Sequence, residues 1–340
     1  MSERAAQETA PSGLVDGHGR LLTYLRLSVT DRCNLRCFYC MPQSRFSWIP
    51  PQEVLSYEEI IRLLELMAGL GIKKVRLTGG EPLIRRDILS LVREIQAIDG
   101  IEKLCITTNG VLLPGLARQL YDLGLRHVNI SLDTLRPELF RQLTGRDHFS
   151  DVWSGIMECI GLGFRPIKIN AVMMRGKNHQ ELPDLAALVL KYPVEVRFIE
   201  FMPVGNESRW ESSYFIPSSE AARMIEERLG PLEPLRQEHM GPARLFRVRG
   251  GMGAIGFINP MSHNFCSSCN RIRITSDGRM RLCLFSDNEI DLKSLLRSGA
   301  SDREISDFIK DAVKRKPESY AKIDRDSHPS CSRKMSSIGG

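Results

Sequence analysis

The stretch Cys33-Asn34-Leu35-Arg36-Cys37-Phe38-Tyr39-Cys40 follows an apolar, strand-like run from Tyr24 to Val29. Its three cysteines are spaced C-x3-C-x2-C, so their thiolates can take up one side of a compact metal centre, and cysteine thiolates are the usual ligands of iron–sulfur clusters. The stretch has no fourth cysteine, which would leave one iron of a four-iron cluster open to another ligand. Two alternatives are a zinc site, although structural zinc prefers four protein ligands, and chance clustering of buried cysteines.

The spacing of Cys33, Cys37 and Cys40, with Tyr39 inside it, resembles the signature of the radical S-adenosylmethionine (radical SAM) enzymes. The resemblance implies that the three cysteines hold a 4Fe-4S cluster whose open iron chelates the amine and carboxylate of S-adenosylmethionine. It also implies that an electron from the cluster cleaves S-adenosylmethionine to methionine and a 5′-deoxyadenosyl radical. The rest of the chain then determines which substrate the radical attacks.

The composition is typical of a globular protein without a membrane segment. The chain has 340 residues, of which 42% are hydrophobic and 26% charged. No apolar run approaches the length that crosses a bilayer, and the polar residues 1–19 lack the apolar core of a secretory signal. We therefore expect the nine cysteines to be reduced and the location to be cytoplasmic. A net charge of +6 suits an anionic ligand, but neither nucleic acid nor a membrane is expected as a partner.

Short β-rich runs alternate with amphipathic helical patterns from residue 21 to about 230. This alternation predicts an α/β fold of parallel strands with helices outside, either an incomplete barrel or an open doubly wound sheet. The resemblance to radical SAM enzymes favours the partial (β/α)6 barrel. One helix should begin at Ser56, with Glu59 completing a capping box. We expect strands at Leu21–Val29, Lys74–Leu77, Lys103–Thr107, His127–Leu132, Ile167–Met173 and Val194–Phe201, and helices near 87–98, 113–123, 151–162 and 180–191.

Ligands of such folds bind at the carboxyl ends of the strands, and several predicted strands end in polar residues. Thr78-Gly79-Gly80-Glu81-Pro82 follows one strand, where two glycines would let a ligand approach the backbone; an ordinary βα turn is the alternative. Lys168 alternates with Ile167 and Ile169, so with Asn170 it faces the opposite side of its strand. A substrate phosphate could pair with this lysine, whereas snorkelling from the strand end is the simpler interpretation.

A second cysteine triplet begins with Cys266-Ser267-Ser268-Cys269 and ends with Cys283. Between them, Ile272–Thr275 and Met280–Leu284 are expected to form a hairpin around Asp277-Gly278, a sequence typical of a type I′ turn. Such a hairpin would bring Cys283 close to Cys269. A zinc knuckle with His263 as a fourth ligand is the alternative.

Alternation in this hairpin puts Arg271 and Arg273 on one face and Ile272 and Ile274 on the other. Paired guanidinium groups are well suited to binding phosphate or carboxylate. An exposed basic strand face is the alternative.

The second triplet, the Arg271-Ile272-Arg273 segment and the final Gly339-Gly340 resemble the GTP 3′,8-cyclase family of molybdenum cofactor biosynthesis, over residues 21–340. The resemblance implies a second 4Fe-4S cluster, held by Cys266, Cys269 and Cys283, whose open iron contacts guanine. Implied catalytic residues are Arg271, Arg273, Gly339 and Gly340; implied S-adenosylmethionine contacts are Tyr39, Gly80, Ser131 and Met202; implied GTP contacts are Arg26, Arg76, Thr107, Lys168, Arg271, Ile272 and Arg273.

The reaction that the resemblance implies begins with hydrogen abstraction from C3′ of GTP. The C3′ radical then adds to C8, which leads to (8S)-3′,8-cyclo-7,8-dihydroguanosine 5′-triphosphate. Implied partners are an external one-electron donor of the flavodoxin or ferredoxin type and a downstream cyclic pyranopterin monophosphate synthase; assembly as a homodimer is left open. Two rivals are another dual-cluster radical SAM enzyme, such as a peptide-modifying maturase, and an electron-transfer or zinc-binding module.

Four regions are expected along the chain: a disordered leader (1–20), the radical SAM partial barrel (21–230), an auxiliary 4Fe-4S domain (231–325) and a tail (326–340). Prolines and glycines after residue 230 mark the middle boundary. The composition of the tail is typical of a disordered end. However, Gly339 and Gly340 have no side chains and could pass through a narrow passage into a site lined with arginines.

Overall fold

The computed structural model describes residues 13–41, 47–205, 210–235, 241–320, 331 and 333–339. Six central strands are parallel and neighbour one another in sequence order. All six were predicted, and the strand Ile167–Met173 has the predicted bounds. The strands are β3 (Tyr24–Ser28), β4 (Lys74–Thr78), β5 (Lys103–Thr108), β6 (His127–Ser131), β7 (Ile167–Met173) and β8 (Val194–Glu200).

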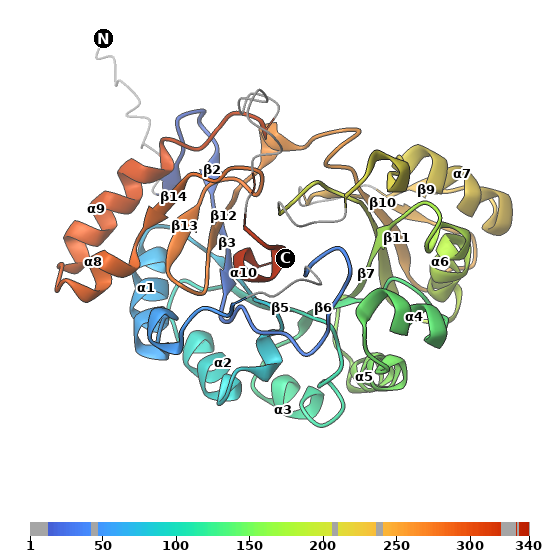
Figure 1. Cartoon of the computed structure of the whole chain (residues 1–340), viewed down its shortest axis with the longest axis horizontal. Coiled ribbons are helices and arrows are strands. Elements are labelled where there is room, and N and C mark those ends of the chain that lie inside the picture. The colour runs from blue at the N-terminus through green and yellow to red at the C-terminus, as the bar shows by residue number, and fades with distance from the viewer. Residues whose placement is uncertain are drawn as a thin grey trace, which may run out of the picture.

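Helices cover the outer side of the curved sheet (Figure 1). Helix α1 begins at the predicted capping box: Ser56 Oγ accepts the Glu59 backbone N–H at 3.2 Å, and Glu59 Oε2 accepts the Ser56 N–H at 2.7 Å. The sequence did not predict α4 or α7. The outer helices are α1 (Tyr57–Gly69), α2 (Ile88–Gln96), α3 (Ala117–Asp122), α4 (Pro137–Thr144), α5 (Phe149–Leu162), α6 (Leu182–Lys191) and α7 (Ser218–Leu229).

Strands from the C-terminal part extend the sheet at both edges. On one side β12 (Arg271–Ile274) pairs in parallel with β3 and continues through β13 (Arg279–Arg281) to β14 (Glu289–Asp291). On the other side β11 (Ala254–Ile258) pairs in parallel with β8 and continues through β10 (Ala243–Arg247) to β9 (Glu233–Pro234). The described strands β3 to β14 thus form one open twelve-stranded sheet, ordered β14-β13-β12-β3-β4-β5-β6-β7-β8-β11-β10-β9, which confirms the predicted partial barrel.

The remaining helices are α8 (Lys293–Arg297), α9 (Asp302–Val313) and α10 (Met335–Ile338). Figure 1 shows α8 and α9 at one side of the molecule and α10 within the curve of the sheet. The segment predicted to be a tail therefore returns to the centre of the fold. Strands from both sides of residue 230 belong to one sheet, so the sheet itself does not mark a boundary there. The boundary predicted at residue 230 stays a prediction.

The expected disordered leader is wrong for residues 13–20. Here β1 (Leu14–Val15) pairs antiparallel with β2 (Leu21–Leu22), and the Leu14 side chain is buried. Asp16 holds the connection by accepting the backbone N–H groups of His18 and Arg20 at 2.9 and 3.0 Å. Burial of leucine and these local hydrogen bonds offset the entropy of ordering the segment. Residues 1–12 lie outside the described part of the chain.

The predicted hairpin between β12 and β13 is present, but its turn is not type I′. A type I′ turn needs positive φ at both central residues. Among the described residues other than glycine, only Asp87 has positive φ. The Gly278 N–H instead donates to Thr275 O at 3.0 Å, and Gly278 itself has φ of 74°. This geometry is a type I turn followed by a left-handed glycine, a common three-residue hairpin connection.

Candidate active site

A cavity of about 880 Å³ runs along the central strands, from their first residues, such as Tyr24 and Lys74, to their carboxyl ends. It is at the upper end of the range for ligand pockets. Both cysteine triplets line it: Cys33, Cys37 and Cys40, called the first triad below, and Cys266, Cys269 and Cys283, called the second triad. The chain brings the two triads to one space although they are far apart in sequence.

The cysteines of the first triad are partly buried, in surroundings that disfavour thiolates. Burial, followed by the charge of Glu81, raises the pKa of Cys33 to about 11. Burial and the neighbouring Cys33 raise the pKa of Cys40 to about 12. Without a metal these thiols would stay protonated at neutral pH, whereas coordination to iron deprotonates a thiol. Three thiols around one end of an open cavity therefore fit a cluster that contributes the missing positive charge.

The Gly79-Gly80 segment packs directly against the loop of the first triad. The Gly80 N–H donates to Thr30 O at 2.7 Å, and a Cβ added to Gly80 would lie 2.1 Å from Arg32 O. A side chain at this position would push the two segments apart. The next residue, Glu81, accepts the Thr108 hydroxyl at 2.8 Å, and burial raises its pKa to about 7.

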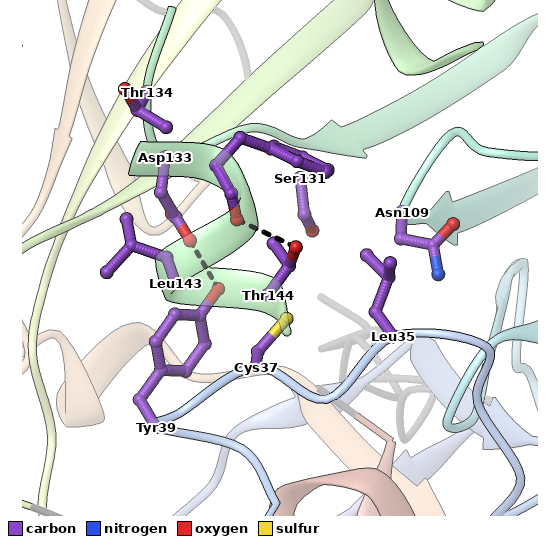
Figure 2. A pocket seen from close by; sticks show the side chains of 10 residues that line it. Leu35, Cys37, Tyr39, Asn109, Ser131, Asp133, Thr134, Leu143 and Thr144 are labelled. Atoms are coloured by element: carbon purple, nitrogen blue, oxygen red, sulfur yellow. Dashed lines mark hydrogen bonds between the residues drawn. The ribbon is translucent and has the colours of Figure 1, made fainter. Parts of the chain in front are cut away.

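Tyr39, from the same loop, is fastened to the end of β6. Its hydroxyl donates to Asp133 Oδ2 at 2.6 Å, as Figure 2 shows, and Asp133 Oδ1 accepts the Val172 N–H at 2.8 Å. Burial raises the pKa of Asp133 to about 6. Ser131 lies beside this pair in the wall of the cavity. The four predicted S-adenosylmethionine contacts, Tyr39, Gly80, Ser131 and Met202, all line the cavity, but their roles stay predictions.

Cationic side chains from several strands form another part of the wall. Arg76 donates from Nε to the Tyr24 hydroxyl at 2.6 Å and from Nη1 to Ile106 O at 3.0 Å, so its guanidinium is fixed. The predicted GTP contacts that line the cavity are Arg26, Arg76, Thr107, Lys168, Arg271 and Arg273. Asn170, expected on the same strand face as Lys168, also lines the cavity, and sequence reasoning missed further lining residues, among them Tyr24, Lys74, Lys103, Asn129, Arg197 and Lys316. Strand alternation could have indicated Lys74 and Arg197, whose side chains point to the cavity face.

Ile272 is the exception among the predicted GTP contacts. Its side chain is fully buried in the hydrophobic core, on the opposite face of β12 from Arg271 and Arg273. The alternation that directs the two arginines into the cavity also directs Ile272 away from it. Only the Ile272 backbone could reach a ligand.

Lys168 faces the cavity from β7, as its alternation with the isoleucines predicted. Its Nζ is 3.9 Å from Glu195 Oε2, and Glu195 also pairs with Arg197. Burial, followed by the charge of Arg197, lowers the pKa of Lys168 to about 8. Lys168 is thus charged at neutral pH and close to its titration range.

The second triad lies beside cations. Lys316 Nζ donates to Arg271 O at 2.8 Å and to Leu282 O, so a buried ammonium ties together the two chain segments that carry Cys269 and Cys283. Burial alone would raise the pKa of Cys269, but Arg271 and Lys316 outweigh it and lower the pKa to about 7. Among the described residues, no three Cys, His, Asp or Glu side chains already surround one point closely enough to hold a single metal ion.

The C-terminal glycine segment reaches the cavity region. Arg273 Nη1 donates to Gly339 O, and the Ser336 backbone donates to the thiol of Cys40. Gly339 has φ of 77°, and a Cβ there would lie 2.2 Å from Thr78 Oγ1, so its seat excludes a side chain. Gly340 lies outside the described residues.

Two segments of the chain match known protein families. Residues 27–189 match the Radical SAM superfamily, and residues 194–322 match the family described as Molybdenum Cofactor Synthesis C. The fold and the first triad thus define a radical SAM enzyme, a class that uses S-adenosylmethionine and a 4Fe-4S cluster. Within the described residues, none of the helices has the length and apolar character to span a bilayer.

Relatives of similar sequence show which family within the radical SAM class the chain belongs to. The GTP 3′,8-cyclase of Pelotomaculum thermopropionicum is 44% identical over 328 residues, covering 96% of this chain and 99% of the relative. That of Gloeobacter violaceus is 45% identical over 323 residues, covering 94% and 99%. The chain belongs to the GTP 3′,8-cyclase family.

Solved structures agree at the level of the fold. SuiB of Streptococcus suis bound to S-adenosylmethionine has a TM-score of 0.58 at 17% identity, covering 86% of this chain and 69% of SuiB. This likeness supports the partial barrel with a C-terminal extension and indicates nothing further about the reaction.

Proposed function

We propose that the chain converts GTP to (8S)-3′,8-cyclo-7,8-dihydroguanosine 5′-triphosphate, the first step of molybdenum cofactor biosynthesis. The observation that carries the proposal is one cavity lined by both cysteine triads and by arginine and lysine side chains. Such a cavity can hold S-adenosylmethionine and an anionic nucleotide together. Membership of the GTP 3′,8-cyclase family supports this assignment.

The first triad would hold the cluster that binds S-adenosylmethionine, and we assign a second 4Fe-4S cluster to Cys266, Cys269 and Cys283. When bound, the clusters would supply one-electron chemistry, and S-adenosylmethionine would supply the carbon radical that removes the hydrogen atom from C3′ of GTP. The protein contributes position and electrostatics. Tyr39, Gly80, Ser131 and Met202 lie in the cavity wall where they could orient S-adenosylmethionine.

The cationic wall would bind the triphosphate. Arg271 and Arg273 project from one face of β12, and Arg26 and Arg76 project from the neighbouring strands β3 and β4 at matching positions. Guanidinium groups can donate paired hydrogen bonds to phosphate oxygens, and Lys168 adds a point charge. Arg273 also binds Gly339 O, so we assign the glycine tail to the same active site.

Enclosure follows from the position of α10. Ile338 is buried with Val204 and Cys331, and Met335 lines the cavity. The tail thus covers part of the site and would keep water and other C–H bonds from a reactive radical.

The proposed pathway partners are a one-electron donor of the flavodoxin or ferredoxin type, because the chemistry begins with an electron, and a cyclic pyranopterin monophosphate synthase that takes up the product. A cytoplasmic location and homodimer formation stay predictions, as do the domain boundaries.

The experiment that tests the proposal is an anaerobic incubation of the cluster-loaded protein with GTP, S-adenosylmethionine and a reductant. We expect 5′-deoxyadenosine and the cyclised nucleotide, with deuterium transferred to 5′-deoxyadenosine when GTP carries it at C3′. Iron analysis should give about eight irons per chain, as two four-iron clusters require. Absence of deuterium transfer would refute the cyclase assignment, and zinc in either triad would refute the corresponding cluster.

A further inference from the structure

The tail segment 333–339 contacts the β12–β13 hairpin at two separate points. At the inner point, Arg273 donates to Gly339 O. At the outer point, Arg333 forms a bidentate ion pair with Asp277 in the hairpin turn: Nη1 lies 2.9 Å from Oδ1, and Nη2 lies 2.9 Å from Oδ2. Because both contacts come from one hairpin, the place that Gly339 reaches depends on where Arg333 is fastened.

The guanidinium of Arg333 is paired at all three of its nitrogens. Besides the two bonds to Asp277, Nε lies 2.9 Å from Glu289 Oε1 in β14. Asp277 is itself held by the Thr275 hydroxyl, which donates to Oδ1 at 2.6 Å. The side chains of Arg333, Asp277 and Glu289 are at most 26% exposed, so solvent screens this contact less than a surface ion pair. A planar fork on a fixed carboxylate specifies orientation as well as attraction.

Cys331, two positions before Arg333, forms further contacts that hold the chain here. The Gly205 N–H donates to Cys331 O at 2.9 Å, and the Cys331 thiol lies 3.2 Å from Nη2 of Arg281. Arg281 is fully buried and pairs with Glu289, the same carboxylate that Arg333 uses. Two arginines therefore share Glu289, and the tail is fixed where it leaves the hairpin turn.

Gly339 lies against Thr78 in a space, called its seat below, that has no room for a side chain, so the register of the tail decides which residue can occupy it. A Cβ at Gly339 would collide with Thr78 Oγ1, and the short helix α10 connects this seat to Arg333. A shift by one residue along a helix moves the chain by about 1.5 Å and rotates it, which would bring Ile338 to a seat that admits only glycine. The anchor therefore has to fix the position along the chain.

We propose that Arg333 is a positioning residue, whose fork on Asp277 and Glu289 sets the register of the tail so that Gly339 reaches its seat against Thr78. The inference rests on the proposed function where it gives the seated tail a part in cyclisation. Arg333, Asp277 and Glu289 are not among the described residues that line the cavity, so a nucleotide bound there would not need them for binding. Loss of the anchor should uncouple the reaction and leave GTP binding intact.

The test compares Arg333→Ala with wild type as cluster-loaded, full-length proteins. Hydrogen–deuterium exchange would report the seating of residues 335–339, and product analysis would report cyclised nucleotide formed per S-adenosylmethionine cleaved. We expect faster exchange of the tail and a fall in this ratio of about tenfold or more, the scale of a lost charge-assisted contact. The KM for GTP should change by less than about twofold, and Arg333→Lys, which keeps the charge and loses the fork, should restore part of the ratio.

Arg303→Ala is the matched control, because Arg303 is 93% exposed and has an ion pair of 3.9 Å within its own helix. It should match wild type in every measurement. If the Arg333→Ala protein loses iron, Asp277→Asn is the second variant. It removes the carboxylate charge and leaves every side chain of the tail intact, and the same two measurements apply to it. Unchanged exchange of the tail in an iron-loaded variant overturns the proposal. Faster exchange with unchanged cyclisation supports the anchor and counts against a catalytic part for the tail.

Discussion

The two cysteine triads line one cavity but lie in opposite electrostatic surroundings. The first triad is near the carboxyl groups of Glu81 and Asp133, and burial keeps the pKa of its thiols high. The second is near Arg271 and Lys316, which lower the pKa of Cys269 to about 7. Under the proposed function, this difference directs each ligand to its own part of the cavity. The carboxyl groups favour the sulfonium cation of S-adenosylmethionine, and the arginines favour the triphosphate.

The largest expected effect comes from removing one ligand in each triad. Cys33→Ala should abolish cleavage of S-adenosylmethionine, because an incomplete first triad cannot hold its cluster. Cys283→Ala should keep some uncoupled cleavage and form no cyclised nucleotide. Chromatographic measurement of 5′-deoxyadenosine and of product checks both. Cys159→Ala, in the core of α5, is the control and should retain both activities. Equal cleavage by the two triad variants would show that the triads do not divide the work.

The next effect concerns the tail, which contacts Cys40 on one side and Arg273 on the other. Gly339→Ala should leave both clusters in place and stop cyclisation, because the new Cβ would lie 2.2 Å from Thr78 Oγ1. Removing Gly339 and Gly340 should have the same result. Thr78→Ala in the Gly339→Ala background should recover part of the product, since it removes the colliding oxygen. Full cyclase turnover by Gly339→Ala would mean that cyclisation does not require the contacts of the tail with the two triad regions.

A smaller effect is expected from the arginines beside the second triad. Arg271→Ala or Arg273→Ala should weaken GTP binding by about 1.5–3 kcal/mol, the value of a charge-assisted hydrogen bond in an enclosed site. Lysine at either position should recover only part, because the planar fork is lost. Calorimetry with GTP and with S-adenosylmethionine separates the two ligands, and only GTP should lose affinity. Unchanged GTP affinity would show that neither arginine binds the nucleotide, although both line the cavity.

The smallest effect is a pH dependence through Lys168, whose pKa is lowered to about 8. Its ammonium is charged below this pH and neutral above it, so the affinity for anionic GTP should fall as pH rises through about 8. The charged fraction of a group with this pKa drops about tenfold between pH 7 and 9, which limits the effect. Lys168→Arg should remove the dependence in calorimetric titrations. The same pH slope in both proteins would place the titrating group elsewhere.

Prediction from sequence succeeded where the pattern is local. The capping box at Ser56, the alternation of Lys168 with the isoleucines and the paired faces of β12 depend on residues a few positions apart. It failed at α4 and α7, at the strands β9–β11 beyond residue 230, and at the hairpin turn. The glycine-rich run Gly250-Gly251-Met252-Gly253 is a loop, as its composition indicates, but the sequence did not predict that it connects the paired strands β10 and β11. Turn type depends on backbone twist, which the Asp277-Gly278 pair does not specify alone.

The sequence by itself determined which candidate groups this protein carries: two cysteine triads at ligand spacing, arginines on one strand face and the glycine pair Gly339-Gly340. Only the tertiary structure decided that these parts share a cavity, that Ile272 turns into the core, and that Arg333 fastens the tail to the Asp277 turn. The physical reason is that alternation and spacing fix which way a side chain points relative to its own element. Which elements then meet depends on the pairing of β12 with β3 and of β11 with β8, contacts between segments far apart along the chain.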